Sequence, residues 1–175
     1  RDRGNDITDN TFFEVQAEKF YQKKVEVARG VIELGQILID TKKGFKGAKG
    51  AWTNWLEDER VNFTDRTARN YMERTKFYNS ECDRLKLDKT ETCFHFEDIL
   101  NEITHREFQT LKSAPEEVKE DVANSKDKEE AEKKIKEYEE QLKQEKLAKD
   151  VLIKSNQELQ EQLEREKKTK KTEYI

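Results

Sequence analysis

The sequence is poor in the residues that most often hold metal ions. Among 175 residues there are two cysteines, Cys82 and Cys93, and two histidines, His95 and His105. Their spacing is irregular and includes no CxxC or HxxxH pair, so we expect no zinc site. Free thiols are typical of a reducing compartment, and we therefore expect a cytoplasmic protein.

Long apolar runs are also missing. The sequence shows neither a signal peptide nor a transmembrane segment, so we expect no membrane contact. Because 42% of the residues are charged and 33% are hydrophobic, one large globule is excluded. A core of about 110 residues followed by an extended arm is expected instead. The chain begins at Arg1 and holds a single methionine, Met72, which we interpret as the mark of a processed fragment.

Catalytic motifs are not evident. Carboxylates are abundant, but no apolar surrounding marks one of them as a general acid or base. The glycine-rich basic segment 42–50, KKGFKGAKG, lacks the Gly-Lys-Ser/Thr ending of a nucleotide-hydrolase phosphate loop. We therefore expect neither enzyme activity nor a cofactor.

The spacing of the apolar residues is helical and predicts an all-α fold. From about residue 11 to residue 43 these residues recur at steps of four and three, which predicts one long helix. Gly30 and Gly35 lower its helix propensity, and we interpret both as places where another helix approaches closely. The expected organisation is a frayed end over 1–10, a helix-turn-helix-like domain over 11–80, a helical middle region over 81–125 and a coiled coil over 126–175.

The stretch from 52 to 78 is the most informative part of the chain, because its apolar and basic residues fall where a helix-turn-helix needs them. Thr64 is a good N-cap for a helix that runs to about residue 78, and a short preceding helix is expected to end near Glu59. Residues 60–63 would form the connection, in which Asn62 tolerates a left-handed backbone. In DNA-binding versions of this motif the second helix enters the major groove.

The polar residues of this second helix and of the basic segment before it fit DNA recognition. Arginine can pair bidentately with guanine and asparagine with adenine, and a threonine hydroxyl can contact phosphate. Residues 42–76 hold nine basic and five acidic residues, a net charge of +4, whereas the whole chain carries −4. An ordinary solvated helix and a flexible lysine loop remain the alternatives. The predicted DNA contacts are Lys42, Lys43, Lys46, Lys49, Thr64, Arg66, Thr67, Arg69, Asn70 and Arg74.

Three segments in this part of the chain, ELGQILIDTKKGF, GAWTNWLEDE and FTDRTARNYM, resemble in their order a bacterial and phage family known only as a domain of unknown function. The matching positions are Leu34, Gly35, Leu38, Lys42, Gly50, Trp52, Trp55, Leu56, Thr64, Arg66, Thr67, Ala68, Tyr71 and Met72. The resemblance covers about 25–78 and implies a helix-turn-helix-like DNA-binding module on mobile elements, followed by a coiled coil. Glu57 and Asp58 lie where such motifs usually have a small residue, and a longer turn would accommodate them.

Further along the chain, local signals predict short helices and then a long one. Thr104 and Glu107 form a capping-box pattern, and Pro115 is expected to open a short helix that ends near Ala123. From 126 onward the chain has no glycine or proline, and an interrupted heptad pattern predicts a coiled coil, with Asn156 fixing a two-stranded register. The predicted dimer contacts are Ile135, Tyr138, Leu142, Leu152, Asn156, Leu159 and Leu163.

These features together predict a DNA-binding homodimer from a plasmid or phage. It would act as a transcriptional regulator or as a partition adaptor whose coiled coil could also recruit another protein. The alternative is a structural or interaction protein in which the first helices form a docking domain and no nucleic acid is bound. The two hypotheses differ over Arg66, Arg69 and Asn70.

Overall fold

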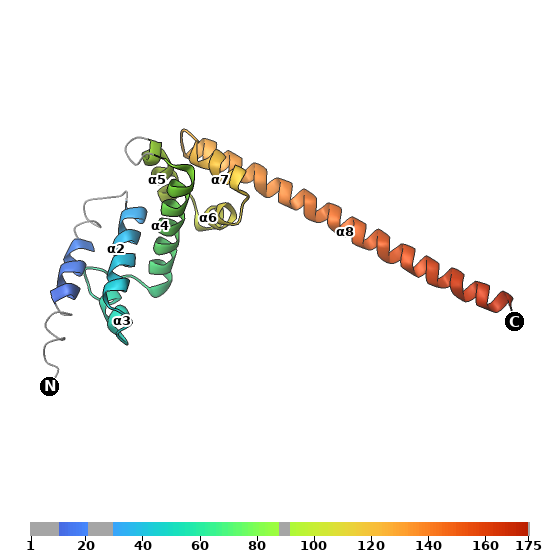
Figure 1. The fold of residues 1–175 in the computed structure, drawn as a ribbon, viewed down its shortest axis with the longest axis horizontal. Helices are drawn as coiled ribbons and strands as arrows, with labels where there is room; N and C mark the ends of the chain where they lie inside the picture. The colour runs from blue at the N-terminus through green and yellow to red at the C-terminus, as the bar shows by residue number, and fades with distance from the viewer. Residues whose placement is uncertain (1–10, 21–29, 88–91, 175) are drawn as a thin grey trace. The chain divides into compact units, whose positions relative to one another are not determined.

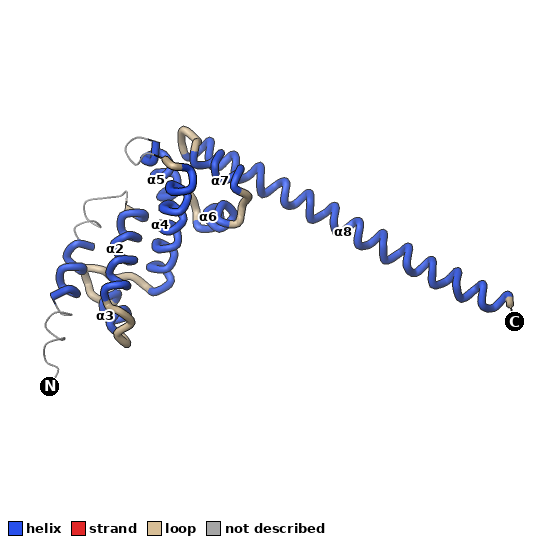
Figure 2. Tube along the Cα trace, viewed as in Figure 1, coloured by secondary structure: helices blue, strands red, loops and turns tan. Residues whose placement is uncertain are grey.

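The computed structural model describes residues 11–20, 30–87 and 92–174 (Figure 1). These residues form helices joined by turns and contain no strand, which confirms the predicted all-α fold (Figure 2). Residues 11–20 are helical. The helices that follow are α2 (Val31–Gly44), α3 (Ala51–Leu56), α4 (Asp65–Leu85), α5 (Thr92–Glu102), α6 (His105–Lys112), α7 (Glu116–Ala123) and α8 (Lys128–Glu173).

The predicted single helix over 11–43 is wrong, because the backbone leaves the helical conformation at Gly30. This residue has φ −116° and ψ 18° and lies immediately before the first turn of α2. The close approach of another helix is confirmed at Gly35 instead. A Cβ at Gly35 would overlap the hydroxyl of Thr75 and lie 2.5 Å from the carbonyl oxygen of Tyr71. Only glycine therefore lets α2 and α4 pack at this distance.

Helix α4 begins as its sequence predicts and ends later. The Thr64 side chain accepts a hydrogen bond from the Thr67 amide at 3.1 Å, which confirms the predicted N-cap. The helix then continues past residue 78 to Leu85, and Lys86 closes it in a left-handed conformation with φ 50°. The apolar stripe of α4 is long enough to serve two separate packing surfaces, so tertiary contacts extend the helix beyond the predicted end.

The connection between α3 and α4 is longer than predicted. Helix α3 ends at Leu56 rather than near residue 59, so residues 57–64 replace the expected four-residue turn. Asn62 has the predicted left-handed backbone, with φ 48°. The longer turn leaves Glu57 exposed and Asp58 at intermediate burial, which is how the chain accommodates two acidic residues at this point. The tight connection of a standard helix-turn-helix is therefore not formed.

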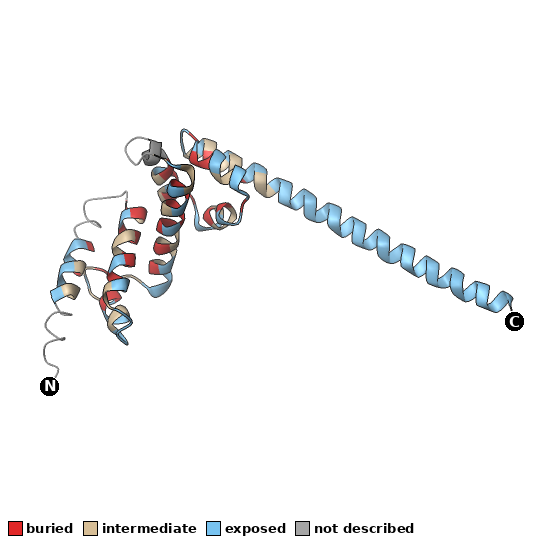
Figure 3. Ribbon diagram, in the orientation of Figure 1, coloured by how far each residue is buried: buried red, intermediate tan, exposed pale blue. Residues whose placement is uncertain are grey.

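Two apolar clusters make up the core, and α4 contributes to both. The first cluster packs helical residues 11–20, α2 and α3 against the N-terminal half of α4, around Trp55 and Met72. The second packs the C-terminal half of α4, around Phe77, against α5, α6, α7 and the start of α8. Buried residues therefore follow α4 along its length (Figure 3). Both clusters belong to a compact unit that ends at Ile135, and a second unit begins at Lys136.

Local capping signals in the middle region are confirmed. The Thr104 side chain accepts a hydrogen bond from the Glu107 amide at 3.2 Å and its hydroxyl donates to the Glu107 carboxylate at 2.9 Å. Pro115 directly precedes α7, which ends at Ala123 as predicted. These caps depend only on neighbours in the sequence, so their residue types were sufficient to locate them.

Helix α8 is continuous from Lys128 to Glu173, but its first turns belong to the compact unit. Ile135 is 1% exposed and packs in the second cluster, so its assignment to a dimer interface is wrong. Tyr138 has intermediate burial, and α8 is exposed from residue 141 to residue 174 (Figure 3). Among the helices of the described residues, none has both the length and the apolar character needed to cross a membrane.

Candidate nucleic-acid interface

A chain of side-chain contacts joins the end of α2 to the first turns of α4. The Lys42 ammonium lies 5.1 Å from the centre of the Trp52 ring, and the Trp52 indole donates a hydrogen bond to Asp65 at 3.2 Å. Asp65 in turn forms an ion pair with Arg69 at 2.9 Å. Lys42 of α2 and Arg69 of α4, which lie far apart in the sequence, are therefore connected through Trp52 and Asp65.

The basic segment 42–50 begins in the last turn of α2 and continues into a turn with defined backbone hydrogen bonds. The Lys46 amide donates to the Lys43 carbonyl at 3.1 Å, and the Ala48 amide donates to the Phe45 carbonyl at 2.9 Å. Lys46 itself has a left-handed backbone, with φ 47°. The four lysines of this segment are exposed. Their ammonium groups are therefore open to solvent and to an anionic partner.

On α4 the predicted contact residues differ in how accessible they are. Arg66 and Arg69 are exposed, whereas Thr67 and Asn70 have intermediate burial. The hydroxyl groups of Thr64 and Thr67 lie 2.9 Å apart and belong to the helix cap. The side chains of Asp65 and Arg69 are 53% and 63% exposed, so their ion pair contributes little to stability and can be exchanged for another anion.

Arg74 is not part of this surface, which corrects its prediction as a DNA contact. It is 8% exposed and donates hydrogen bonds to the carbonyl oxygens of Leu100 at 2.6 Å and Ile103 at 2.9 Å. Its guanidinium lies 5.3 Å from the centre of the Phe108 ring, and burial lowers the pKa of Arg74 from its usual value. Arg74 therefore satisfies carbonyl groups at the C-terminal end of α5.

The sequence did contain a signal for the burial of Arg74. It lies three residues after Tyr71 and three and four residues before Phe77 and Tyr78, which places it within the apolar stripe of α4 rather than opposite it. The carbonyl groups that it binds come from a distant part of the chain, and no local pattern indicates them.

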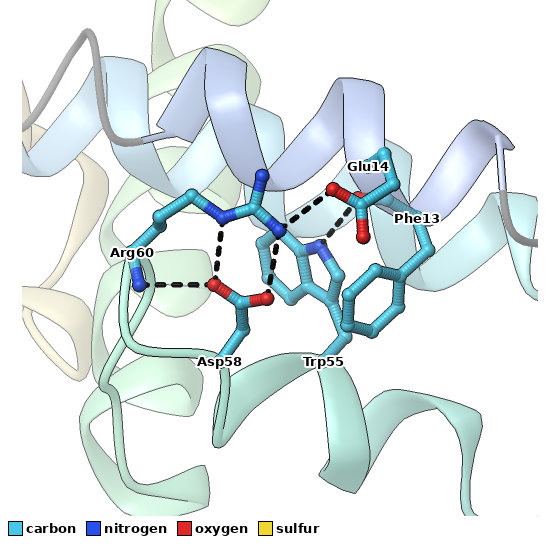
Figure 4. A network of polar contacts seen from close by, with 5 residues as sticks. All are labelled: Phe13, Glu14, Trp55, Asp58 and Arg60. Atoms are coloured by element: carbon cyan, nitrogen blue, oxygen red, sulfur yellow. Dashed lines mark hydrogen bonds and ion pairs between the residues drawn. The ribbon is translucent and has the colours of Figure 1, made fainter.

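Arg60 forms a polar network that the sequence reasoning missed (Figure 4). Its guanidinium binds the Asp58 carboxylate through bonds of 2.9 and 2.8 Å and reaches Glu14 at 2.9 Å. The nearby Trp55 indole donates to the Phe13 carbonyl at 3.3 Å. These contacts tie the connection between α3 and α4 to helical residues 11–20. Hydrogen bonding from Arg60 holds the pKa of the Asp58 carboxyl below its usual value, and Asp58 and Glu14 raise the pKa of Arg60.

The fold and this surface define an all-α protein whose compact unit carries exposed basic residues on α2, on the loop after it and on α4. The chain belongs to a family described as proteins of unknown function, DUF3102, whose profile matches residues 10–145. The predicted resemblance to a family of unknown function is confirmed to that extent. No curated protein and no solved structure shows significant similarity to the chain.

Proposed function

We propose that this protein binds double-stranded DNA through the basic surface formed by the end of α2, the loop after it and the first turns of α4. The observation that carries the proposal is the contact chain from Lys42 through Trp52 and Asp65 to Arg69. It brings together two groups of cations that are separate in the sequence. A phosphate backbone rewards such clustering, because each neutralised phosphate releases counterions.

The distribution of positive charge supports this proposal. Of the nine basic residues between 42 and 76, Arg60 and Arg74 are engaged inside the protein. The other seven are exposed, namely Lys42, Lys43, Lys46, Lys49, Arg66, Arg69 and Lys76. The engaged arginines are therefore separate from the cations that face solvent, and six of the latter, all except Lys76, belong to the proposed DNA contact.

Different residues of this surface would have different roles on DNA. The lysines suit phosphate contacts, which position the protein without reading sequence. Arg66, Arg69 and Asn70 have the chemistry for base edges, and Arg66 and Asn70 are four residues apart, so they lie on the same side of α4. The proposal does not require the tight turn of a standard helix-turn-helix, because it depends on the exposed side of α4 and not on its angle to α3.

Pairing of two chains through α8 is the second part of the proposal. Beyond Tyr138 the apolar residues of α8 are exposed, and burying them against another helix would be favourable. Two linked copies would bind two DNA sites with a raised effective concentration. Such a dimer fits a transcriptional regulator or partition adaptor of a mobile element, located in the bacterial cytoplasm.

A gel shift with three alanine substitutions tests the DNA contact. In the variant Arg66→Ala/Arg69→Ala/Asn70→Ala we expect DNA affinity to fall by about a hundredfold, because base and phosphate contacts are lost together. The unchanged chain should lose affinity as salt rises, with a log–log slope of about −0.9 for each phosphate contact. Fragments selected from the source genome would serve as DNA.

A matched control removes two positive charges from elsewhere in the compact unit. Arg106→Ala/Lys133→Ala changes exposed residues and should leave DNA affinity within about twofold. If the unchanged chain binds no DNA even at low salt, the proposal is wrong. In that case normal assembly of the triple variant would favour the alternative, a docking domain and a coiled coil that act without nucleic acid.

A further inference from the structure

Helix α8 has an apolar side that no described residue of the chain covers. Its exposed large apolar residues within the second unit are Leu142, Leu147, Val151, Leu152, Ile153, Leu159, Leu163 and Tyr174. At 3.6 residues per turn, six of them, those at 142, 152, 153, 159, 163 and 174, fall within an arc of about 120°. Leu147 and Val151 lie on the opposite side. One side of this helix therefore has the width of a helix-packing face.

The charged residues on the same side decide between possible orientations of a second copy. The seven-residue repeat that contains Leu142, Leu152, Leu159 and Leu163 also places five charged residues in the seam. These are Glu145, Lys149, Glu166, Lys170 and Glu173. In a parallel, in-register pair, each of them would face its own copy. Five layers of like charge would then oppose association.

We infer that α8 pairs with α8 of a second copy of this chain in the antiparallel direction. This inference rests on the proposed dimer and specifies its geometry. In one antiparallel register, four of the five charged seam residues meet a residue of opposite charge. The facing pairs are Leu152 with Leu163, Lys149 with Glu166, Glu145 with Lys170, Asn156 with Leu159, and Leu142 with Glu173 of the second copy.

The twofold symmetry of this arrangement doubles each pair. The two Asn156–Leu159 layers lie at the middle of the seam, a Leu152–Leu163 layer follows on each side, and four ion pairs flank these layers. One flanking contact, Lys146 with Lys167 of the second copy, is repulsive and also occurs twice, but it lies at the edge of the seam, where solvent screens it. The ion pairs within this part of the helix use other residues, Lys143 with Glu140 and Arg165 with Glu161, both at 3.9 Å. Four of the five charges of the seam are therefore complementary to a reversed second copy and not to a parallel, in-register one.

Charge reversal distinguishes the two orientations in the full-length chain. Lys149→Glu alone and Glu166→Lys alone should each weaken dimerisation about tenfold, because two attractive pairs become repulsive. The double variant K149E/E166K should restore the affinity of the unchanged chain. Lys154→Glu makes the same charge change outside the seam and is the matched control. Sedimentation equilibrium measures the dissociation constants, and circular dichroism verifies that helicity is unchanged.

Cysteine cross-linking gives an independent readout of direction. A mixture of the Lys149→Cys and Glu166→Cys variants should form a disulfide-linked pair, whereas each variant alone should give no more cross-link than the unchanged chain with its native cysteines. Self-linking of each variant alone, or unchanged dimerisation of K149E, would overturn the antiparallel arrangement and leave a parallel dimer. A chain that stays monomeric would overturn both the arrangement and the dimer. The gel shift reports on DNA binding separately, since it reads residues of the compact unit.

Discussion

Helices α4 and α8 both carry apolar stripes, but only one of them is covered within the chain. In α4 the stripe is buried from Ala68 to Cys82, and it packs into two clusters. In α8 burial stops at Ile135, and the large apolar residues from Leu142 to Leu163 are 43% to 64% exposed (Figure 3). A periodic pattern thus identifies a surface that needs a partner and does not say whether the partner lies in the same chain.

The charged residues of the two helices differ in the same way. Along α4, Arg74 is buried and Glu81, 5% exposed, pairs with Arg84 at 2.6 Å. Along α8 beyond residue 140, the charged residues are exposed. A buried charge needs a fixed partner, so Arg74 and Glu81 of α4 contribute to the fold of the compact unit. The exposed charges of α8 remain available for contacts with a second helix.

The strongest test of this comparison removes one apolar residue from each stripe. Phe77 is 9% exposed and contacts Phe96 and Phe108 at centroid distances of 6.2 and 5.6 Å. Phe77→Ala should lower the free energy of unfolding by about 3–5 kcal/mol, because a large cavity opens in the core. Leu159→Ala, at a residue that is 56% exposed, should leave the unfolding of the compact unit unchanged and weaken association only. Urea denaturation at low protein concentration measures both, and equal destabilisation by the two variants would contradict the comparison.

A smaller effect is expected for the buried cation of α4. Arg74→Ala leaves the carbonyl groups of Leu100 and Ile103 without their donor, which should cost about 2–4 kcal/mol. Thermal unfolding measures this loss. Because Arg74 lies away from the basic surface, the salt dependence of DNA binding by the folded variant should match that of the unchanged chain. A weaker salt dependence of DNA binding by the variant than by the unchanged chain would show that Arg74 contacts phosphate after all.

The smallest effect concerns the first turns of the two helices, where they should behave alike. Thr64 caps α4, and Asp127 accepts a hydrogen bond from the Glu130 amide at 2.9 Å at the start of α8. Thr64→Ala and Asp127→Ala should each lower the free energy of unfolding by about 1 kcal/mol. Chemical denaturation of the single variants provides the values. An effect of Thr64→Ala alone would show that the start of α8 does not belong to the cooperative unit.

The sequence predicted correctly those features that depend on residues close together in the chain. The caps at Thr64 and Thr104 and the left-handed Asn62 depend on a few neighbouring residues, and the structure confirms each of them. The errors at Arg74 and Ile135 have one cause. Each residue lies on the apolar stripe of its own helix, but the partners that bury it come from α5, α6 or α7, and no local signal identifies those partners.

The sequence predicted which cations belong to the candidate surface, but it did not predict the side-chain contacts that join them. Its lysines and the exposed arginines of α4 were identified as cations of one region, whereas the role of Trp52 and Asp65 in joining them depends on how α2, α3 and α4 pack. The network of Arg60 depends on helical residues 11–20 in the same way. Such contacts require the tertiary structure, because the residues involved lie far apart in the sequence.

The missing side chain at Gly35 has a consequence for how the basic surface meets a ligand. A Cβ at Gly35 would clash with Thr75 and with the Tyr71 carbonyl oxygen. The two helices are therefore in close contact at this point, and close packing resists movement of one helix against the other. The end of α2 that carries lysines and the end of α4 that carries arginines are therefore expected to keep a constant separation. A template of this kind loses little conformational entropy when it binds, and it favours ligands whose anionic groups already have the same spacing.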